Sequence, residues 1–283
     1  EMTTMPLRPG IFRVREESAM TIYLCVPDFE GILCGVYDAW MSRKGHDNVR
    51  LELKGTYHEL ELFSEYVESE STHGKARKVI NSVCGKLSQE VYKKIYVASL
   101  SQDAGRADKI YRFLVQAFSI GPGILDQLQI PESYEIFELC RNVYNENHLL
   151  VEFLRFSQAS GGVLVARIGP KNDVMTLLAP HFADRLPEEN WIIYDENREK
   201  AAVHPRGKPW ILVNHPLEQP DGDSIWQLCL EQETDEREYE DLWISFFHTI
   251  AIKERTNPVC QRNHLPLRYR AYMTEFKRGS TPG

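Results

Sequence analysis

The chain has 283 residues, of which 42% are hydrophobic and 26% are charged, and its formal net charge at pH 7 is -8. This composition is typical of a globular protein that buries a core, as one large domain or two small ones. The negative charge argues against a protein that wraps nucleic acid over its whole surface, although it leaves room for a local basic face. No apolar run approaches the roughly 18 residues of a membrane-spanning helix.

The six cysteines are widely spaced and form no C-x-x-C pair. This spacing argues against a zinc ribbon and favours reduced thiols in a cytoplasmic protein. Residues 1–19 contain no apolar signal-peptide region, and strand-like sequence begins only after Met20. We therefore expect Met20 to be the functional start and residues 1–19 to be an extension or a cloning remnant.

The first predicted unit, residues 20–72, contains a strand and a helix. Residues 21–26 predict the strand, and the helix that opens at Phe29 carries apolar side chains at helical spacing as far as Trp40. Residues 49–53 predict a second strand that pairs beside the first. The acidic stretch 57–71 is expected to be a solvated helix or a connection.

The remaining residues, 73–283, form a second predicted unit, either separate or joined with the first in one compact domain. Its first part is helical, because apolar residues recur every three or four positions along each segment. The Gly-Pro-Gly sequence that begins at Gly121 ends one of these helices. The predicted helices span residues 75–87, 89–100, 106–119 and 133–147.

A central sheet is predicted between residues 146 and 198. Residues 149–156 alternate in polarity like a strand, and Gly161 and Gly162 supply the positive φ angles of a tight turn into a second strand, Val163–Ile168. Residues 191–194 form a third, wholly apolar strand. We predict one sheet in which the first two strands are an antiparallel hairpin.

One helix should cover this sheet. Asp173 is placed to cap it, and Pro180 must kink it or restart it. Further on, residues 226–230 predict a short helix or strand, and Asp235 with Glu238 resembles a capping box that begins another helix. Residues 266–277 predict a last helix. The sequence as a whole predicts an α+β fold: a mixed or antiparallel sheet, flanking helices and a helical C-terminus.

Six polar side chains sit at the ends of these central segments, where they are able to converge: His148, Arg155, His181, Arg185, Asp195 and Arg198. An arginine fork matches phosphate geometry, and histidine adds a titratable donor. The sharpest hypothesis is one anion site formed by Arg155, Arg185 and His181, with a helix starting at Pro180. The alternative is that Arg155 or Arg185 pairs with Asp195, Asp184 or Glu152 in a buried structural network, which is the commoner use of such residues.

The sequence names no reaction. His148, His181 and Asp195 suit a divalent ion chemically, but their spacing matches no recognised metal signature, so we expect no metal. P-loop, dinucleotide-binding, zinc-deaminase and Ser-His-Asp patterns are absent, so we also expect no cofactor. Whether the protein is an enzyme stays open at this point.

A basic C-terminal stretch interleaves cations with Tyr269, Tyr272 and Phe276. Such a pattern suits a single-stranded nucleic-acid path, although aromatic residues at helical spacing are more often core residues. The basic residues are Lys253, Arg255, Arg262, Arg268, Arg270, Lys277 and Arg278. Two other charged runs are interpreted as solvated faces: the basic cluster Lys75, Arg77, Lys78 and Lys86, and the acidic run 231–241, which is alternatively a repellent rim.

Several ordered motifs resemble one uncharacterised bacterial family. They are YLCVPDFEGILCGVYDAW near the start, HLLVEFLRF, HFADRL followed by WIIYD, the pattern Y..LW..F...IAI.ER.N over residues 239–257, and P.RY....TEF over residues 266–276. The family is known as a "probable DNA metabolism protein", a domain of unknown function. The sequence departs from its pattern at Val26 to Asp28 and at Arg270, where the family has an aromatic residue.

The resemblance implies a setting in DNA repair or modification. Members of the family occur fused to, or encoded beside, uracil-DNA-glycosylase-like domains and a radical S-adenosylmethionine protein. The leading hypothesis is an accessory protein that binds DNA or a nucleotide-bearing substrate and works with such a partner. The alternatives are an enzyme that acts on nucleic acid through His148, Arg155, His181 and Arg185, and a protein–protein adaptor without a ligand site.

Overall fold

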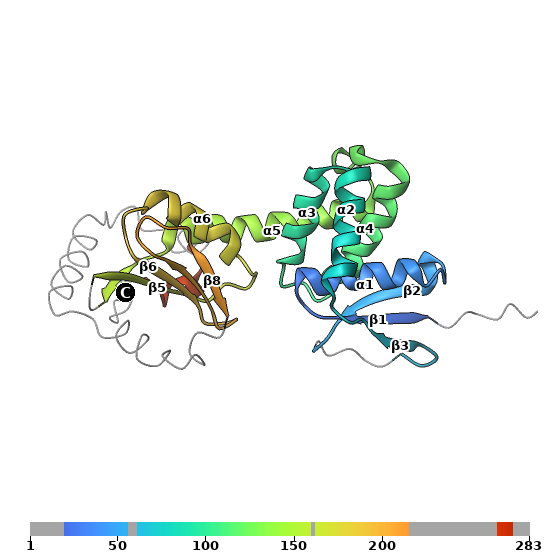
Figure 1. Ribbon diagram of the computed structural model, residues 1–283, viewed down its shortest axis with the longest axis horizontal. Coiled ribbons are helices and arrows are strands. Elements are labelled where there is room, and N and C mark those ends of the chain that lie inside the picture. Colours follow the sequence, from blue (N-terminus) through green and yellow to red (C-terminus); the bar gives the residue numbers. More distant parts are fainter. Residues whose placement is uncertain (1–19, 56–60, 160–161, 215–264, 274–283) are drawn as a thin grey trace, which may run out of the picture.

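The computed structural model describes residues 20–55, 61–159, 162–214 and 265–273. Its helices accompany a three-stranded sheet and a five-stranded sheet, which confirms the predicted α+β class. The long helix α5, Pro131–Phe153, runs from the first group of elements to the second (Figure 1). Buried side chains of both groups belong to one continuous hydrophobic cluster.

The first sheet has the order β2-β1-β3, and all its strands are parallel. The strands β1, Thr21–Cys25, and β2, Val49–Leu53, confirm the predicted pair. Strand β3, Glu65–Glu68, lies in the stretch that was expected to be a solvated helix or a connection, so that prediction is wrong. This strand lies at the edge of the sheet and its side chains are half-buried or exposed, so it lacks the apolar alternation that marks a strand.

Four helices belong to this first group, and their positions agree with the predictions within a few residues. Helix α1 packs on β1 and β2, and α4 packs on β2. Asp28 caps α1 by accepting a hydrogen bond from the Gly31 amide at 2.6 Å. The helices are α1, Phe29–Met41; α2, His73–Lys86; α3, Gln89–Ser99; and α4, Arg106–Ile120.

The predicted strand over residues 149–156 is wrong, because residues 149–153 are the end of α5. The predicted helix over 133–147 is therefore too short. The buried residues of α5 recur at helical spacing through Val143 and Glu146 to Leu150, so one helical period runs through the supposed strand. Eight residues of alternating polarity are too few to separate a strand from the end of a long helix.

The hairpin in the structure joins β4, Ser157–Ala159, to β5, Val163–Ile168. Its strands are antiparallel, and Gly162 has a φ of 74° at the turn. Residues 191–194 lie in β6, Trp191–Asp195, which pairs in parallel with β5. The second and third predicted strands are thus confirmed as members of one sheet, while the first partner of the hairpin is β4.

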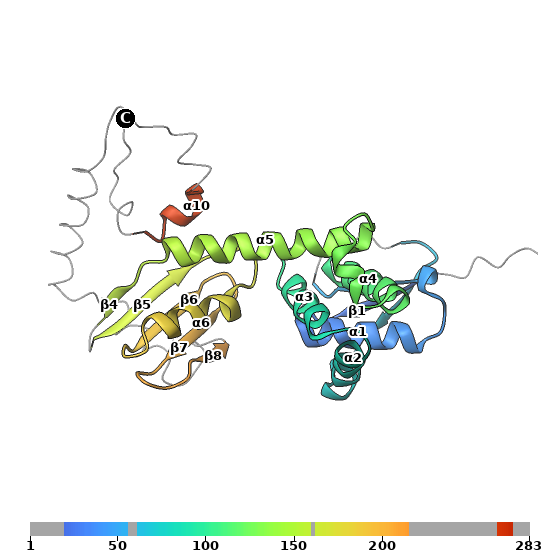
Figure 2. The same cartoon turned by 90° about the horizontal axis from the view of Figure 1, so that it is seen from above.

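The sheet continues with two strands that are not among the predicted elements. Strands β7, Lys200–His204, and β8, Ile211–Asn214, add antiparallel neighbours and complete the order β4-β5-β6-β7-β8. Helix α6, Met175–Arg185, connects β5 to its parallel neighbour β6 and lies over the sheet (Figure 2). The N-cap of α6 is Val174, so Asp173 does not cap it; Asp173 forms an ion pair with Lys200.

Pro180 lies inside α6 and does not restart it. A proline removes one backbone hydrogen bond, but Leu178 and Phe182 on either side of it are buried, and this packing compensates for the missing bond. The C-terminal helix α10, Leu267–Arg270, is shorter than the predicted helix over 266–277. The predictions for residues 226–230, for the helix after Asp235 and for the acidic run 231–241 lie outside the described residues.

Within the described part of the chain, no helix is long and apolar enough to cross a membrane.

Candidate functional site

Glu146 organises the contact between α5, α10 and the loop that follows β5. Its buried carboxylate accepts hydrogen bonds from the backbone amides of Lys171 at 3.0 Å and Asn172 at 2.7 Å. The Asn172 side chain donates to it as well, at 2.6 Å, and so do Arg268 and Tyr269 of α10, each at 3.0 Å. One carboxylate on α5 thereby fixes two other segments.

Asp195 and Arg198, two residues of the predicted anion site, meet directly. Arg198 donates to the fully buried Asp195 carboxylate at 3.1 Å, and the Asn197 amide donates to it at 3.0 Å. Burial raises the pKa of Asp195, and the nearby Arg198 opposes that shift. Arg198 also donates to the carbonyls of Pro170 and Lys171. The structural alternative names Arg155 or Arg185 as the partner of a carboxylate, so the pair of Arg198 with Asp195 is a different one.

Arg268 also has partners within the protein. Besides Glu146, it donates to the Tyr269 hydroxyl at 2.7 Å, and its guanidinium lies over the Tyr269 ring at 4.6 Å from the centroid. Arg270, in the same helix, is half-buried. Arg255, the other predicted cation of the C-terminal path, lies outside the described residues.

The remaining predicted site residues occupy separate positions. His148 is largely exposed on α5 and lies 3.1 Å from Glu152, while Arg155 donates to the carbonyls of Glu152 and Leu154. His181 packs edge-to-face on Phe182 within α6, and Arg185 is exposed in the last turn of that helix. In the described structure no hydrogen bond or ion pair joins His181 to Arg185.

Two premises of the predicted Arg155–His181–Arg185 anion site are wrong. Arg155 follows a helix and not a strand, and α6 begins at Met175, so its free N–H groups lie a full turn before His181. The part of the chain that the structure describes also contains no group of three or more His, Cys, Asp or Glu side chains suited to a metal ion.

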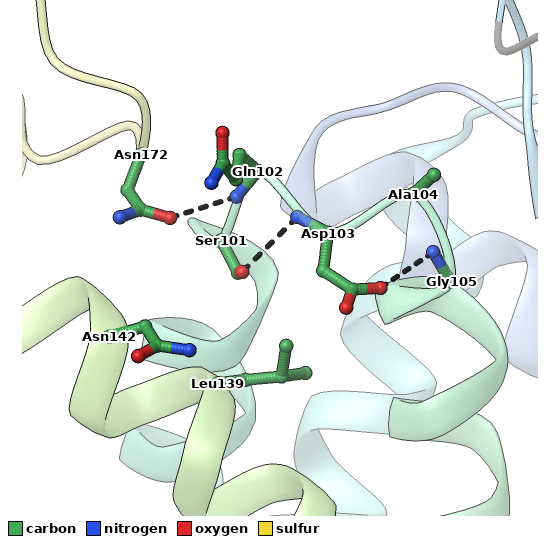
Figure 3. Close-up of a pocket in the computed structure, with 8 residues that line it drawn as sticks. All are labelled: Ser101, Gln102, Asp103, Ala104, Gly105, Leu139, Asn142 and Asn172. Atoms are coloured by element: carbon green, nitrogen blue, oxygen red, sulfur yellow. Dashed lines mark hydrogen bonds between the residues drawn. The ribbon is translucent and has the colours of Figure 1, made fainter.

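A polar pocket of about 380 Å³ lies between the α3–α4 loop, α5 and Asn172 (Figure 3). Its loop amides already have partners: Gln102 donates to the Asn172 side chain at 2.9 Å, and Gly105 donates to Asp103 at 2.8 Å. The Asp103 amide donates to the Ser101 hydroxyl at 3.2 Å. Because these donors are occupied and Asp103 adds a carboxylate, the pocket is poorly suited to an anion.

A different kind of site lies between α1, α2 and the end of α4. A hollow of about 400 Å³ is formed there by three aromatic rings, two lysines and small apolar groups. None of its described lining residues is a carboxylate. They are Val36, Tyr37, Trp40 and Met41 of α1, Lys78, Val79, Ser82 and Lys86 of α2, and Phe118 of α4.

A second hollow, of about 460 Å³, adjoins the first and shares Trp40 and Met41 with it. It is formed by the end of α1 and the loop that follows, with Ala39, Arg43, Gly45 and His46 as the other lining residues. We call the two hollows together the basic aromatic groove. Arg43 has a φ of 53°, an uncommon conformation for a residue with a side chain, and such conformations cluster at functional sites.

Trp40 is held rigidly between the two hollows. Its ring makes edge contacts with the rings of His46, Tyr111 and Phe118, at centroid distances of 4.8, 6.2 and 5.4 Å. The His46 Nδ1 atom lies 2.7 Å from the Tyr111 hydroxyl. Burial raises the pKa of Tyr111 to about 12, so the hydroxyl stays protonated and able to donate to His46 at neutral pH.

Cations surround this platform. Lys78 lies over the Tyr37 ring at 5.2 Å, and Lys86 and Arg43 are exposed without an ion pair to any described residue. The nearby Asp38 carboxylate of α1 is paired with Lys75 at 2.8 Å. In the loop after α1, Asp47 is an exposed acidic residue beside His46. The groove is therefore a local basic face on a protein of negative net charge.

The sequence shows both halves of this groove but does not join them. Lys78 and Lys86 belong to the cluster interpreted as a solvated helix face, and Tyr37 and Trp40 belong to the apolar stripe of the first helix. One feature of the sequence does indicate the groove: the apolar stripe ends in a large aromatic residue, Trp40, which is followed closely by Arg43 and Lys44. The packing of α2 beside α1, which brings the lysines to the aromatic rings, is not readable from one sequence.

A known family model matches part of the chain. The model of a domain of unknown function (DUF4130) matches residues 104–275, which is more than half of the chain. It covers α4, α5, the second sheet and α10, and of the groove it includes Phe118. No curated protein matches the chain.

Proposed function

Since the chain belongs to the DUF4130 family, whose function is unknown, we propose a function from its groove: it binds nucleic acid or a nucleotide-bearing substrate as an accessory protein of DNA metabolism. The single observation that carries the proposal is the basic aromatic groove. Its rings offer flat apolar surface to a nucleobase, and its cations offer partners to phosphate.

The absence of carboxylates among the described lining residues strengthens this argument. Phosphate repels carboxylates, so a groove that takes a phosphate-bearing ligand should exclude them. The nearest such group in α1, Asp38, accepts from Ser69 at 2.8 Å as well as from Lys75. Its charge is thus engaged by the protein and opposes a bound phosphate less.

The resemblance of the sequence motifs supports the DNA-metabolism setting. Relatives of that kind are encoded beside uracil-DNA-glycosylase-like domains or a radical S-adenosylmethionine protein. We propose that the protein acts with such a partner, supplying nucleic-acid binding while the partner supplies the chemistry.

Fluorescence anisotropy with labelled DNA tests the proposal. Lys86→Ala should weaken binding several-fold at low salt, because it removes an exposed cation of the groove, whereas Lys208→Ala, an exposed lysine in the β7–β8 loop, should not. Binding should also weaken as salt increases. The proposal fails if the protein binds no phosphate-bearing ligand at low salt, or if the two lysine variants behave alike.

The adaptor alternative also has an observation in its favour. Tyr134, Phe137 and Tyr144 are partly exposed along α5, and Arg141 lies over the Phe137 ring at 5.9 Å. Exposed aromatic and arginine side chains are typical anchors of protein interfaces.

Calorimetric titration with the radical S-adenosylmethionine protein tests the adaptor alternative. It should show binding that Phe137→Ser weakens and Lys86→Ala does not. If no heat of binding is measured, the adaptor alternative is wrong.

A further inference from the structure

We infer that the groove takes single-stranded nucleic acid, with two successive unpaired bases in the two hollows on either side of Trp40 and Met41. This inference rests on the proposed function and specifies its ligand. It differs from the C-terminal path expected from the sequence, because every contact it uses comes from α1, α2, α4 and the loop after α1.

The two hollows suit neighbouring units of one chain. Their volumes of about 400 and 460 Å³ fall within the range of roughly 300–1,000 Å³ typical of small-ligand sites. A mononucleotide would fill one hollow and leave the other empty. A strand that passes over the shared ridge of Trp40 and Met41 fills both, and the second base adds stacking energy without a new entropic cost of association.

The chemistry of the lining favours unpaired bases. In a duplex the faces of the bases are covered by their neighbours, so a protein ring stacks only on a base that is unpaired. The first hollow offers the rings of Tyr37, Trp40 and Phe118. Apart from Tyr37, Ser82 is the one residue with a hydroxyl among its described lining residues. Such a lining stacks on the face of a base and offers few hydrogen-bonding groups to the edge of the base. We therefore expect weak sequence preference.

The cations lie on both sides of the ridge, as successive phosphates require. Lys78 and Lys86 line one hollow and Arg43 lines the other. If all three neutralise phosphates, the logarithm of affinity should fall with the logarithm of salt concentration at a slope of about -2, since each contact to a single strand contributes roughly -0.7. Removing one cation should reduce the slope by about one third.

An anisotropy experiment on the full chain compares four probes: a labelled ten-nucleotide single strand, the duplex of the same strand, a mononucleotide as competitor, and polyglutamate as competitor. The single strand should bind at least tenfold more tightly than the duplex or the mononucleotide. Polyglutamate should compete poorly, because it engages the cations but not the rings.

Two matched pairs of variants separate stacking from charge. Trp40→Leu keeps an apolar side chain but removes the ring, and it should weaken single-strand binding at least tenfold, while Trp210→Leu in the second group of elements should not. Arg43→Gln should lower the salt slope, and Arg43→Lys should restore it. Trp40→Phe retains a ring and should keep most of the affinity. If thermal melting shows that Trp40→Leu does not fold, Trp40→Phe still tests whether a ring at this position is sufficient for binding.

The outcomes distinguish this inference from the proposed function. If the duplex binds as tightly as the single strand and Lys86→Ala weakens both, the groove binds nucleic acid but the single-strand inference is overturned. If no probe binds, both are overturned. If polyglutamate competes as well as DNA and Trp40→Phe and Trp40→Leu match the parent, the groove binds acidic protein and both are again overturned.

Discussion

The side chain of Glu146 is 3% exposed, yet it receives hydrogen bonds from two segments that are far from each other in the sequence. An ionised buried carboxylate is costly unless donors surround it. Here the donors include an arginine, Arg268, and two backbone amides, so the cost is offset. A buried ion pair of this kind contributes little net stability, but removing one of its partners is strongly destabilising.

We therefore predict that Glu146→Gln destabilises the fold by about 2–4 kcal/mol, because the neutral amide leaves Arg268 unpaired and turns an NH2 group towards other donors. Urea denaturation measures the change. Glu135→Gln, at an exposed position of the same helix, should change stability by less than about 0.5 kcal/mol. Equal effects of the two substitutions would contradict this account of Glu146.

The buried thiol of Cys25 gives a prediction about alkaline stability. Burial, and to a lesser extent the charge of Asp38, raises the pKa of Cys25 from 9.0 to about 12. The unfolded chain therefore loses this proton first, so the thiol's contribution is complete below pH 9 and is lost as the pH rises towards about 12. Between pH 9 and 10 the unfolding free energy should therefore fall as the pH rises, and Cys25→Ala should make this fall less steep by about 1 kcal/mol per pH unit. Parallel slopes, measured by urea denaturation at several pH values, would show that burial does not perturb this thiol.

At the scale of elements, the close packing of α1 on β1 depends on two glycines one helical turn apart. A Cβ at Gly35 would lie 2.1 Å from the Cys25 sulfur, and a Cβ at Gly31 would lie 2.5 Å from the Val26 carbonyl oxygen. Neither contact is tolerable without a shift of the helix. The glycines thus set the distance between helix and sheet, and with it the position of Trp40 at the far end of α1.

We predict that Gly35→Ala destabilises the protein by about 1–3 kcal/mol, although alanine is the better helix former. Gly85 in α2 is the matched control, because nothing lies within 4 Å of a Cβ placed there. Gly85→Ala should leave stability unchanged or raise it by about 0.5 kcal/mol. Thermal and urea unfolding measure both, and a stabilising Gly35→Ala would refute the packing argument.

The same scale shows which elements a single sequence can predict. The helices of the first group and the strand Val163–Ile168 have clear periods and clear ends, and they were predicted correctly. Residues 149–153 were not, because the long helical period of α5 was broken into a helix and a strand. Strands β3 and β8 carry mostly half-buried or exposed side chains, so burial imposes no alternation on their sequence.

The candidate site illustrates a different limit. The structural alternative names Arg155 or Arg185 as a partner of Asp195, but the partner in the structure is Arg198, three residues away. The pairing of Glu146 with Arg268 joins residues 122 positions apart, and the groove joins Trp40 to Lys86 and Phe118 across three helices. Residue types indicate what chemistry is available, but such distant pairings depend on the tertiary arrangement.

At the scale of the whole molecule, a few hydrogen bonds join the first group of elements to the loop and helix between β5 and β6. The side chain of Asn172, 5% exposed, accepts from the Gln102 amide and donates to Glu146. The Asp173 amide donates to the Leu100 carbonyl at 2.8 Å, and the Tyr96 hydroxyl donates to Thr176 at 2.7 Å. These bonds connect α3 and the loop after it to α6 and the loop before it, so the two sheets should unfold together.

The last prediction tests this coupling. Asn172→Ala removes two side-chain hydrogen bonds, one of them buried, so that the Gln102 amide loses its partner and one Glu146 oxygen loses one of its two donors, which should lower global stability by about 2–3 kcal/mol. Hydrogen exchange should then separate the two sheets: amides of β5 and β6 should open at lower free energy than those of β1 and β2, whereas in the parent both should share one value. Asn81→Ala, at an exposed position of α2, should leave both values unchanged. If Asn172→Ala lowers the opening free energy of both sheets equally, other contacts maintain the coupling, and the loop at Asn172 contributes stability without joining the two halves of the molecule.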